Sequence, residues 1–139
     1  MNGLFCVAVH ALVYLHRRGC QLSSEELAEN ICTNPARVRK VMSALKRAGL
    51  VETRTGIAGG YLFCGDPSAL KLEQVARALD VRFVEPAWHS GGVDRPCLVA
   101  SGMAGVMDEV MDDLDARCHA RLAQLSLADI EERLLEGRK

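Results

Sequence analysis

A glycine-rich turn between two short apolar segments constrains the fold of this chain more than any other feature. Residues 49–64 read GLVETRTGIAGGYLFC, with the apolar segments at 50–51 and 61–63. Glycine adopts backbone angles that a side chain would forbid, and three glycines lie between these segments. The pattern therefore predicts a tight β-hairpin.

The segment just before this hairpin is predicted to be a basic helix. Asn34 is a good N-cap, and Pro35 suits the first helical position, where its missing N–H costs nothing. Residues 34–48 carry five basic side chains and no acidic one, and their apolar residues recur at helical spacing. A basic helix followed at once by a β-ribbon is the plan of a winged helix-turn-helix. That fold places a helix in the major groove of DNA and a loop beside it.

Two further helices are predicted before the basic one. Residues 3–17 are apolar nearly all round, which indicates a buried helix and places Cys6 in the core. Ser23 or Ser24 can cap the second helix, with Glu26 three residues after Ser23 completing a capping box.

The second half of the chain is also predicted to be helical. A short helix is expected at 72–79, a loop or linker at 84–96, and a last amphipathic helix at 127–135. Between them a long helix begins at Cys97, and we expect Asp94 to cap it. Its apolar residues recur at steps of three and four, a spacing that favours pairing with another helix and predicts a homodimer. This predicted dimer stripe consists of Val99, Met103, Val106, Val110 and Leu114.

The distribution of charge is more informative than its total. The chain has 139 residues, enough for one domain with an appended helix, and a net charge of −1. Residues 1–71 hold nine Lys and Arg against five Asp and Glu, whereas residues 72–139 hold eight against thirteen. This asymmetry is typical of a protein with one DNA-facing end, and the competing interpretation is a chance split.

These motifs resemble the Rrf-type (BadM-like) family of winged-helix transcription regulators, which includes IscR, NsrR and CymR. The resemblance covers roughly the first 80 residues, and the Gly-Gly-Tyr hairpin with its preceding helix is its most specific part. The stretches that carry it are Ala8 to Leu15, Leu45 to Pro67 (with Gly49-Leu50-Val51, Thr55-Gly56 and Gly59-Gly60-Tyr61), and Leu72 to Val75. It implies a DNA-binding domain and a long C-terminal dimerisation helix.

The chain departs from the family pattern in two places. Family members often have a small residue and then Arg or Lys after the Gly-Gly-Tyr strand, where this chain has Cys64-Gly65. Members that bind an iron–sulphur cluster place three cysteines close together near the start of the long helix, where this chain offers Cys97 alone. Because such a cluster needs several thiolates, no cofactor is expected.

DNA contacts are expected from the basic helix, the turn before it and the hairpin. Arg37, Arg39 and Lys40 lie where they could reach base edges, and the amides near Asn34 could bind phosphate. The competing interpretation of the helix is an ordinary solvated basic face. The full set of predicted DNA-binding residues is Thr33, Asn34, Pro35, Arg37, Arg39, Lys40, Lys46, Arg47, Arg54, Thr55, Gly56, Gly59 and Tyr61.

The six cysteines show no C-x-x-C pair, so a zinc module is not expected. Cys97 is the main candidate redox sensor because a helix N-terminus and the adjacent Arg95 both favour thiolate. Cys32, just before the basic helix, is a second candidate, although a buried structural thiol is the favoured interpretation at that position. Cys118 and His119 could bind metal with other groups.

The sequence therefore predicts a mainly α fold with a small β-hairpin, namely a winged helix-turn-helix with a long dimerisation helix. The expected division is a DNA-binding domain at 1–82, a linker at 83–96 and dimerisation and C-terminal helices at 97–139. The expected function is a cytoplasmic homodimeric repressor, not an enzyme, that binds double-stranded DNA at a pseudo-palindromic operator and responds to thiol oxidation or an unknown effector. The alternatives are a metal or iron–sulphur sensor with ligands such as Cys97, Cys118 and His119, and a winged-helix protein-interaction module.

Overall fold

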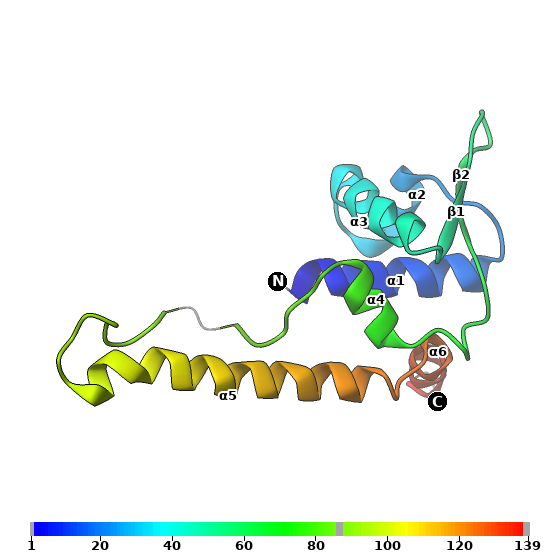
Figure 1. Cartoon of the computed structure of the whole chain (residues 1–139). Helices are drawn as coiled ribbons and strands as arrows, with labels where there is room; N and C mark the ends of the chain where they lie inside the picture. The colour runs from blue at the N-terminus through cyan, green and yellow to red at the C-terminus, as the bar shows by residue number, and fades with distance from the viewer. Residues whose placement is uncertain (1, 86–87, 138–139) are drawn as a thin grey trace.

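The fold is mainly helical with one β-hairpin, as the sequence predicts (Figure 1). The structure, a computed structural model, describes residues 2–85 and 88–137. In Figure 1, the first four helices and the hairpin form the upper body, and a long helix runs beneath it. The elements are α1 (Asn2–Arg18), α2 (Ser24–Ile31), α3 (Pro35–Arg47), β1 (Val51–Arg54), β2 (Gly60–Phe63), α4 (Leu72–Ala78), α5 (Leu98–Leu122) and α6 (Leu127–Glu136).

One hydrophobic core holds the upper body together. Leu12 and Leu15 of α1 are buried against apolar residues of α2, α3 and α4, including Leu27 and Leu45. Burying a leucine side chain stabilises the fold by roughly 1.5–3 kcal/mol. The core extends to Leu127 at the start of α6, which packs back on α1.

The ends of α2 and α3 are fixed by the caps that the sequence predicts. The Ser23 hydroxyl accepts a hydrogen bond from the Glu26 N–H (3.1 Å), and the Glu26 carboxylate accepts one from the Ser23 N–H (3.4 Å). The Asn34 side chain accepts a hydrogen bond from the Arg37 N–H (2.8 Å), with Pro35 in the first helical position. These caps fix the residues at which α2 and α3 begin.

The second strand of the hairpin is attached to the α1–α2 connection at Tyr61. Val51 pairs with Phe63 and Arg54 with Gly60, and Leu22 exchanges two backbone hydrogen bonds with Tyr61 (3.0 and 2.8 Å). Gly60 has φ 155°, and a Cβ there would lie 2.4 Å from the Leu22 carbonyl oxygen. Only glycine therefore permits this close approach of the two backbones.

The long helix α5 is attached to the upper body at the C-terminal end of the helix. Leu72 donates to the Leu125 carbonyl (2.8 Å) and Leu127 donates to the Leu70 carbonyl (2.9 Å), which ties the α5–α6 turn to the start of α4. No residue of α5 is buried.

The expectation that Asp94 caps α5 is wrong, because the N-cap is Cys97. The reason is a turn in which the Arg95 N–H bonds the Gly92 carbonyl (3.0 Å). Helical hydrogen bonding begins only where Ser101 donates to the Cys97 carbonyl (2.9 Å).

The expectation that α1 is buried all round is also wrong. Cys6 is exposed, and it lines an open, largely apolar groove of about 730 Å³ with Val9 and with Ile130 of α6. His10 is exposed at the same groove and lies 2.8 Å from Asn30. The described helices include none that is long and apolar enough to cross a membrane.

Candidate nucleic-acid interface

Four of the five basic side chains of α3 form two parallel rows on the solvent side of the helix. Arg39 and Lys46 are seven residues apart, as are Lys40 and Arg47, so each pair lies on one side of the helix about 10 Å apart. All four side chains are exposed, whereas Val38, Val41, Met42 and Leu45 are buried. The helix therefore presents two pairs of cations to solvent, and the members of each pair lie about two helical turns apart.

Among the residues that the structure describes, Arg39 has one ionic neighbour. Its Nη1 lies 3.8 Å from Oε1 of Glu25 on α2, and both side chains are more than half exposed. An exposed pair of this kind contributes little stability, so the guanidinium can turn to another anion at small cost.

The turn before α3 is tightly built. Cys32 caps the end of α2 in the left-handed conformation (φ 63°), and Thr33 donates to the Ala28 carbonyl (3.0 Å). This turn places Thr33, Asn34 and Pro35 at the N-terminal end of α3, beside Arg37.

The hairpin projects beside α3 as a wing (Figure 1). Arg54, Thr55 and Gly56 at its tip are exposed, Gly59 closes the same turn half-buried by donating to the Gly56 carbonyl (3.0 Å), and the half-buried Tyr61 lies beside the α1–α2 connection. The structure thus brings the predicted residues of α3, of the turn and of the wing to the same end of the molecule.

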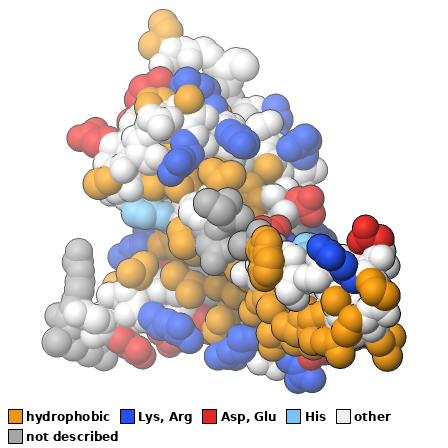
Figure 2. Space-filling view, turned by 90° about the vertical axis from the view of Figure 1, so that its left-hand side faces the viewer, with side chains coloured by type: hydrophobic (Ala, Val, Ile, Leu, Met, Phe, Trp, Pro, Cys, Tyr) orange, Lys and Arg blue, Asp and Glu red, His pale blue; other side chains and the backbone are white. Residues whose placement is uncertain are grey.

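The predicted dimer stripe of α5 is exposed along its whole length. The exposed fractions of its five residues run from 38% for Met103 to 64% for Val99. Figure 2 shows hydrophobic side chains gathered at the end of the molecule where α5 begins. Exposed apolar patches of this kind are typical of interaction surfaces.

The chain matches the model of the Rrf2 family, whose description is iron-dependent transcriptional regulator, over residues 2–133. It belongs to the Rrf2 family. YwnA of Bacillus subtilis (strain 168), named as an HTH-type transcriptional regulator, is 30% identical over 134 residues, which cover 96% of this chain and 98% of YwnA. This Rrf2-family chain is therefore a transcriptional regulator and not an enzyme.

Solved structures agree on the fold of this Rrf2-family chain. A transcriptional regulator from Lactobacillus plantarum superimposes with a TM-score of 0.84 at 23% identity, covering 96% of this chain and 91% of that one. IscR from T. potens superimposes with a TM-score of 0.72 at 19% identity, covering 100% and 90%. Rrf2-family regulators bind DNA and are typically dimeric.

The donor side chains of this chain do not fit an iron centre held within one protomer. Iron–sulphur clusters need several thiolates together, but Cys97 lies at the start of α5, roughly 30 Å along the helix from Cys118 and His119. Among the residues that the structure describes, no three His, Cys, Asp or Glu side chains form a group that could hold a metal ion. The ligand set of Cys97, Cys118 and His119 is not brought together.

Three cysteines differ in ways that bear on their reactivity. Backbone N–H groups of Ala100 and Val99 at the start of α5 lower the pKa of the exposed Cys97 thiol. Burial, with a smaller contribution from Glu52, raises the pKa of the Cys64 thiol on the wing side of the fold. Cys32 is exposed rather than buried, so the alternative of a buried thiol at that turn is wrong.

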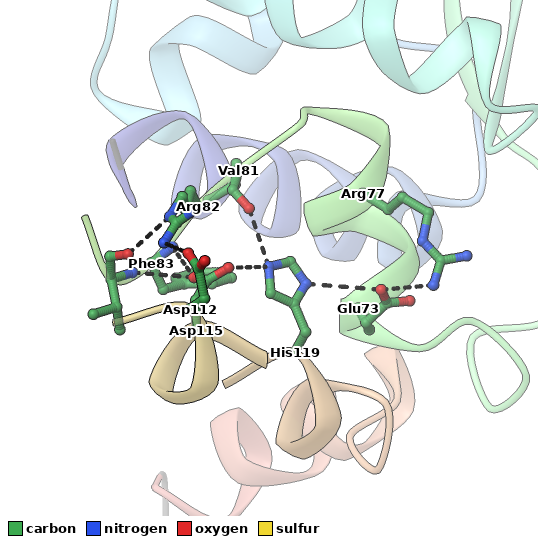
Figure 3. A network of polar contacts seen from close by, with 9 residues as sticks. Glu73, Arg77, Val81, Arg82, Phe83, Asp112, Asp115 and His119 are labelled. Atoms are coloured by element: carbon green, nitrogen blue, oxygen red, sulfur yellow. Dashed lines mark hydrogen bonds and ion pairs between the residues drawn. The ribbon is translucent and has the colours of Figure 1, made fainter. Parts of the chain in front are cut away.

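A polar cluster joins α5 to the segment after α4, and sequence reasoning missed it (Figure 3). The Asp115 carboxylate accepts hydrogen bonds from the Phe83 and Val84 N–H groups (2.7 and 3.1 Å), and the Nε2–H of His119 donates to the Val81 carbonyl (3.1 Å). His119 Nδ1 also lies 3.7 Å from a carboxylate oxygen of Glu73 on α4. We call Asp115 and His119 with the segment 81–84 the α5 clasp.

The surroundings of Asp115 in the clasp favour the charged form of its carboxyl group. Partial burial acts to raise its pKa, but the hydrogen bonds from Val84 and Phe83, helped by the charges of His119 and Arg82, outweigh burial and lower the pKa. The only hint in the sequence is the spacing of Asp115 and His119, which puts both on one face of a helix.

In the folded protein, we expect iodoacetamide to alkylate Cys97 at lower pH than Cys64. The thiolate is the reacting species, so the pH of half-maximal rate should lie below the usual thiol range for Cys97 and above it for Cys64. Peptide mass spectrometry across neutral to alkaline pH measures both rates.

The control is the same protein unfolded in urea, where the local hydrogen bonds and burial are lost and the two profiles should converge. If the folded protein shows the same profile for both thiols, the helix N-terminus does not activate Cys97.

Proposed function

We propose that this Rrf2-family regulator is a homodimeric repressor that binds a pseudo-palindromic operator through α3 and the wing of each protomer. The observation that carries the proposal is the pair of exposed basic rows on α3 beside a projecting wing at one end of the molecule. A repressor of this kind acts by occupying its operator. A two-fold dimer would contact half-sites about one helical turn of DNA, or a multiple of it, apart.

Each group of site residues has a distinct proposed role. Arg37, Arg39 and Lys40 read base edges in the major groove, while Lys46 and Arg47 at the other end of α3 bind phosphates. Thr33, Asn34 and Pro35 bring the N-terminal end of α3, with its positive dipole, toward a phosphate. Arg54 and Thr55 reach the minor groove or its phosphates, Gly56 and Gly59 let the backbone approach, and Tyr61 donates to phosphate.

The decisive experiment is a selection of genomic DNA fragments with the purified protein, followed by titration of the enriched duplexes. Enrichment of a sequence with two-fold symmetry supports a dimeric reader, and steep loss of affinity with salt supports phosphate contacts. If no sequence is enriched, the alternative of a protein-interaction module gains support.

Replacing Arg39 should weaken operator binding without unfolding the protein. We expect Arg39→Ala to lower affinity by about 5- to 150-fold, because a base-reading arginine is worth about 1–3 kcal/mol. Fluorescence anisotropy with the selected duplex at physiological salt measures the change.

The matched control is Arg133→Ala, which removes the same charge from an exposed site on α6. Circular dichroism should show that both variants remain folded. Unchanged affinity in Arg39→Ala would remove this residue from the site.

We propose that the dimer forms through the stripe on α5. The stripe is apolar and exposed in one protomer, and its near-heptad spacing suits a second helix. In this arrangement residues 1–82 form the DNA-binding unit, 83–96 the linker, and 97–139 the dimerisation and C-terminal helices.

A charge in the middle of the stripe should separate the protomers. We expect Val106→Asp to be monomeric in sedimentation velocity, because a buried unpaired carboxylate opposes association. Affinity for the full operator should fall by about 10²–10⁴, because the two half-sites are then bound independently.

Ala116→Asp is the control, since Ala116 is exposed on α5 but lies outside the stripe. A Val106→Asp protein that remains dimeric would place the interface elsewhere.

We propose further that Cys97 gives the regulator its response to oxidants. Its thiol is exposed, and its pKa is lowered at the start of the dimer helix. Hydrogen peroxide would convert the thiolate to sulfenic acid and release hydroxide. That change at the N-cap alters the first turn of α5, next to the stripe.

Peroxide should therefore lower the operator affinity of the wild-type protein but not that of Cys97→Ser. Anisotropy titrations before and after treatment, with mass spectrometry of the Cys97 peptide, measure both effects. An equal loss in both proteins would assign the response to another thiol, such as the exposed Cys32.

A further inference from the structure

We propose that Asp115 and His119 are positioning residues that set the distance between the two recognition helices of the dimer. The inference rests on the proposed dimeric reader, in which α5 carries the partner and α3 carries the DNA contact. The angle between α5 and the upper body then decides where each α3 falls on the operator.

The stripe and the clasp lie on opposite faces of α5. Successive residues of an α-helix are turned by about 100°. Measured from Val99, the stripe residues lie within roughly 60° of one direction, whereas Asp115 and His119 lie about 160–200° away. One face of α5 is thus directed to the second protomer while the other is fixed to its own upper body.

α5 is attached to its own upper body at two places. The first is the backbone connection at its C-terminal end, where Leu72 donates to Leu125 and Leu127 donates to Leu70. The second is the α5 clasp, one to two turns earlier in the helix. The connection at the end acts as a pivot, and the clasp fixes the angle about that pivot.

The clasp is anchored to α1 as well as to α5. The Phe83 ring lies edge-on to Phe5 of α1 (centroids 5.2 Å apart) and edge-on to His119 (5.3 Å). Arg82 adds a contact between its Nη2 and a carboxylate oxygen of Asp112 (2.5 Å), as Figure 3 shows. The segment 81–84 therefore links the core helix to the dimer helix.

Leu122, near the pivot, packs against the core, but no residue of α5 is buried, so the polar contacts of the clasp fix the angle of its longer N-terminal part. From Leu122, beside the pivot, to the first residue of α5 the helix is about 36 Å long at 1.5 Å per residue, so a rotation of about 10° moves its far end by roughly 6 Å. A displacement of that size corresponds to the rise of one to two base pairs, at about 3.4 Å each.

The test compares operators in which the spacing between the two half-sites is varied one base pair at a time. Wild-type protein should prefer one spacing. Asp115→Ala should bind the preferred duplex about threefold or more weakly while its affinity for neighbouring spacings changes less, so that the preference flattens. Asp115→Asn keeps a side-chain oxygen that can accept from Phe83 or Val84 and should restore part of the preference.

Glu109→Ala is the matched control, because it removes an exposed carboxylate nearer to the start of the same helix. It should leave the spacing preference as in the wild type. Circular dichroism and sedimentation velocity on each variant confirm that the fold and the dimer persist.

A merely structural role for Asp115 would lower the affinity for all spacings by the same factor, and that result overturns the inference while leaving the dimeric reader intact. A dimeric Asp115→Ala protein with an unchanged preference overturns it in the same way. Wild-type protein with no spacing preference overturns the dimeric reader itself, and this inference with it.

Discussion

The buried face of α1 is the constraint on which the rest of the structure depends. α2, α3, α4, α6 and the wing strand β2 all pack against this helix. Leu12 and Leu15 are almost completely buried at its centre, so the recognition helix, the wing and the C-terminal helix share one support. A change in the packing of α1 would therefore disturb the DNA-binding end and the dimer end together.

The sequence predicted the features that depend on neighbouring residues. The hairpin, the capping box at Ser23 and the Asn34 cap of α3 each arise from residues a few positions apart, and each leaves a local pattern. The five exposed cations of α3 were predictable for the same reason, because helical periodicity separates Val38 and Leu45 from them. Their role in DNA binding stays a prediction.

The features that the sequence did not reveal depend on contacts between distant segments. Asp115 and Phe83 are more than thirty residues apart and joined by a side-chain-to-backbone bond, which has no periodic signature. Cys6 looked like a core residue because its helix is apolar on both sides, and only the placement of α6 shows which side is covered. Asp94 looked like a cap because the turn at 92–95 is invisible in composition alone.

The backbone pairing between Leu22 and Tyr61 determines which part of the wing can change without disturbing α3. Leu22 adds a single antiparallel bridge to the second strand of the wing, which secures that strand at Tyr61, while the turn beyond it projects into solvent. Residues 55–57 at the tip are exposed, whereas the Ala58 carbonyl accepts a hydrogen bond from the Gln21 side chain, so residues 55–57 can be lengthened, shortened or replaced with little effect on the position of α3. The contacts proposed for α3 in the major groove and the length of the wing can therefore change independently of one another.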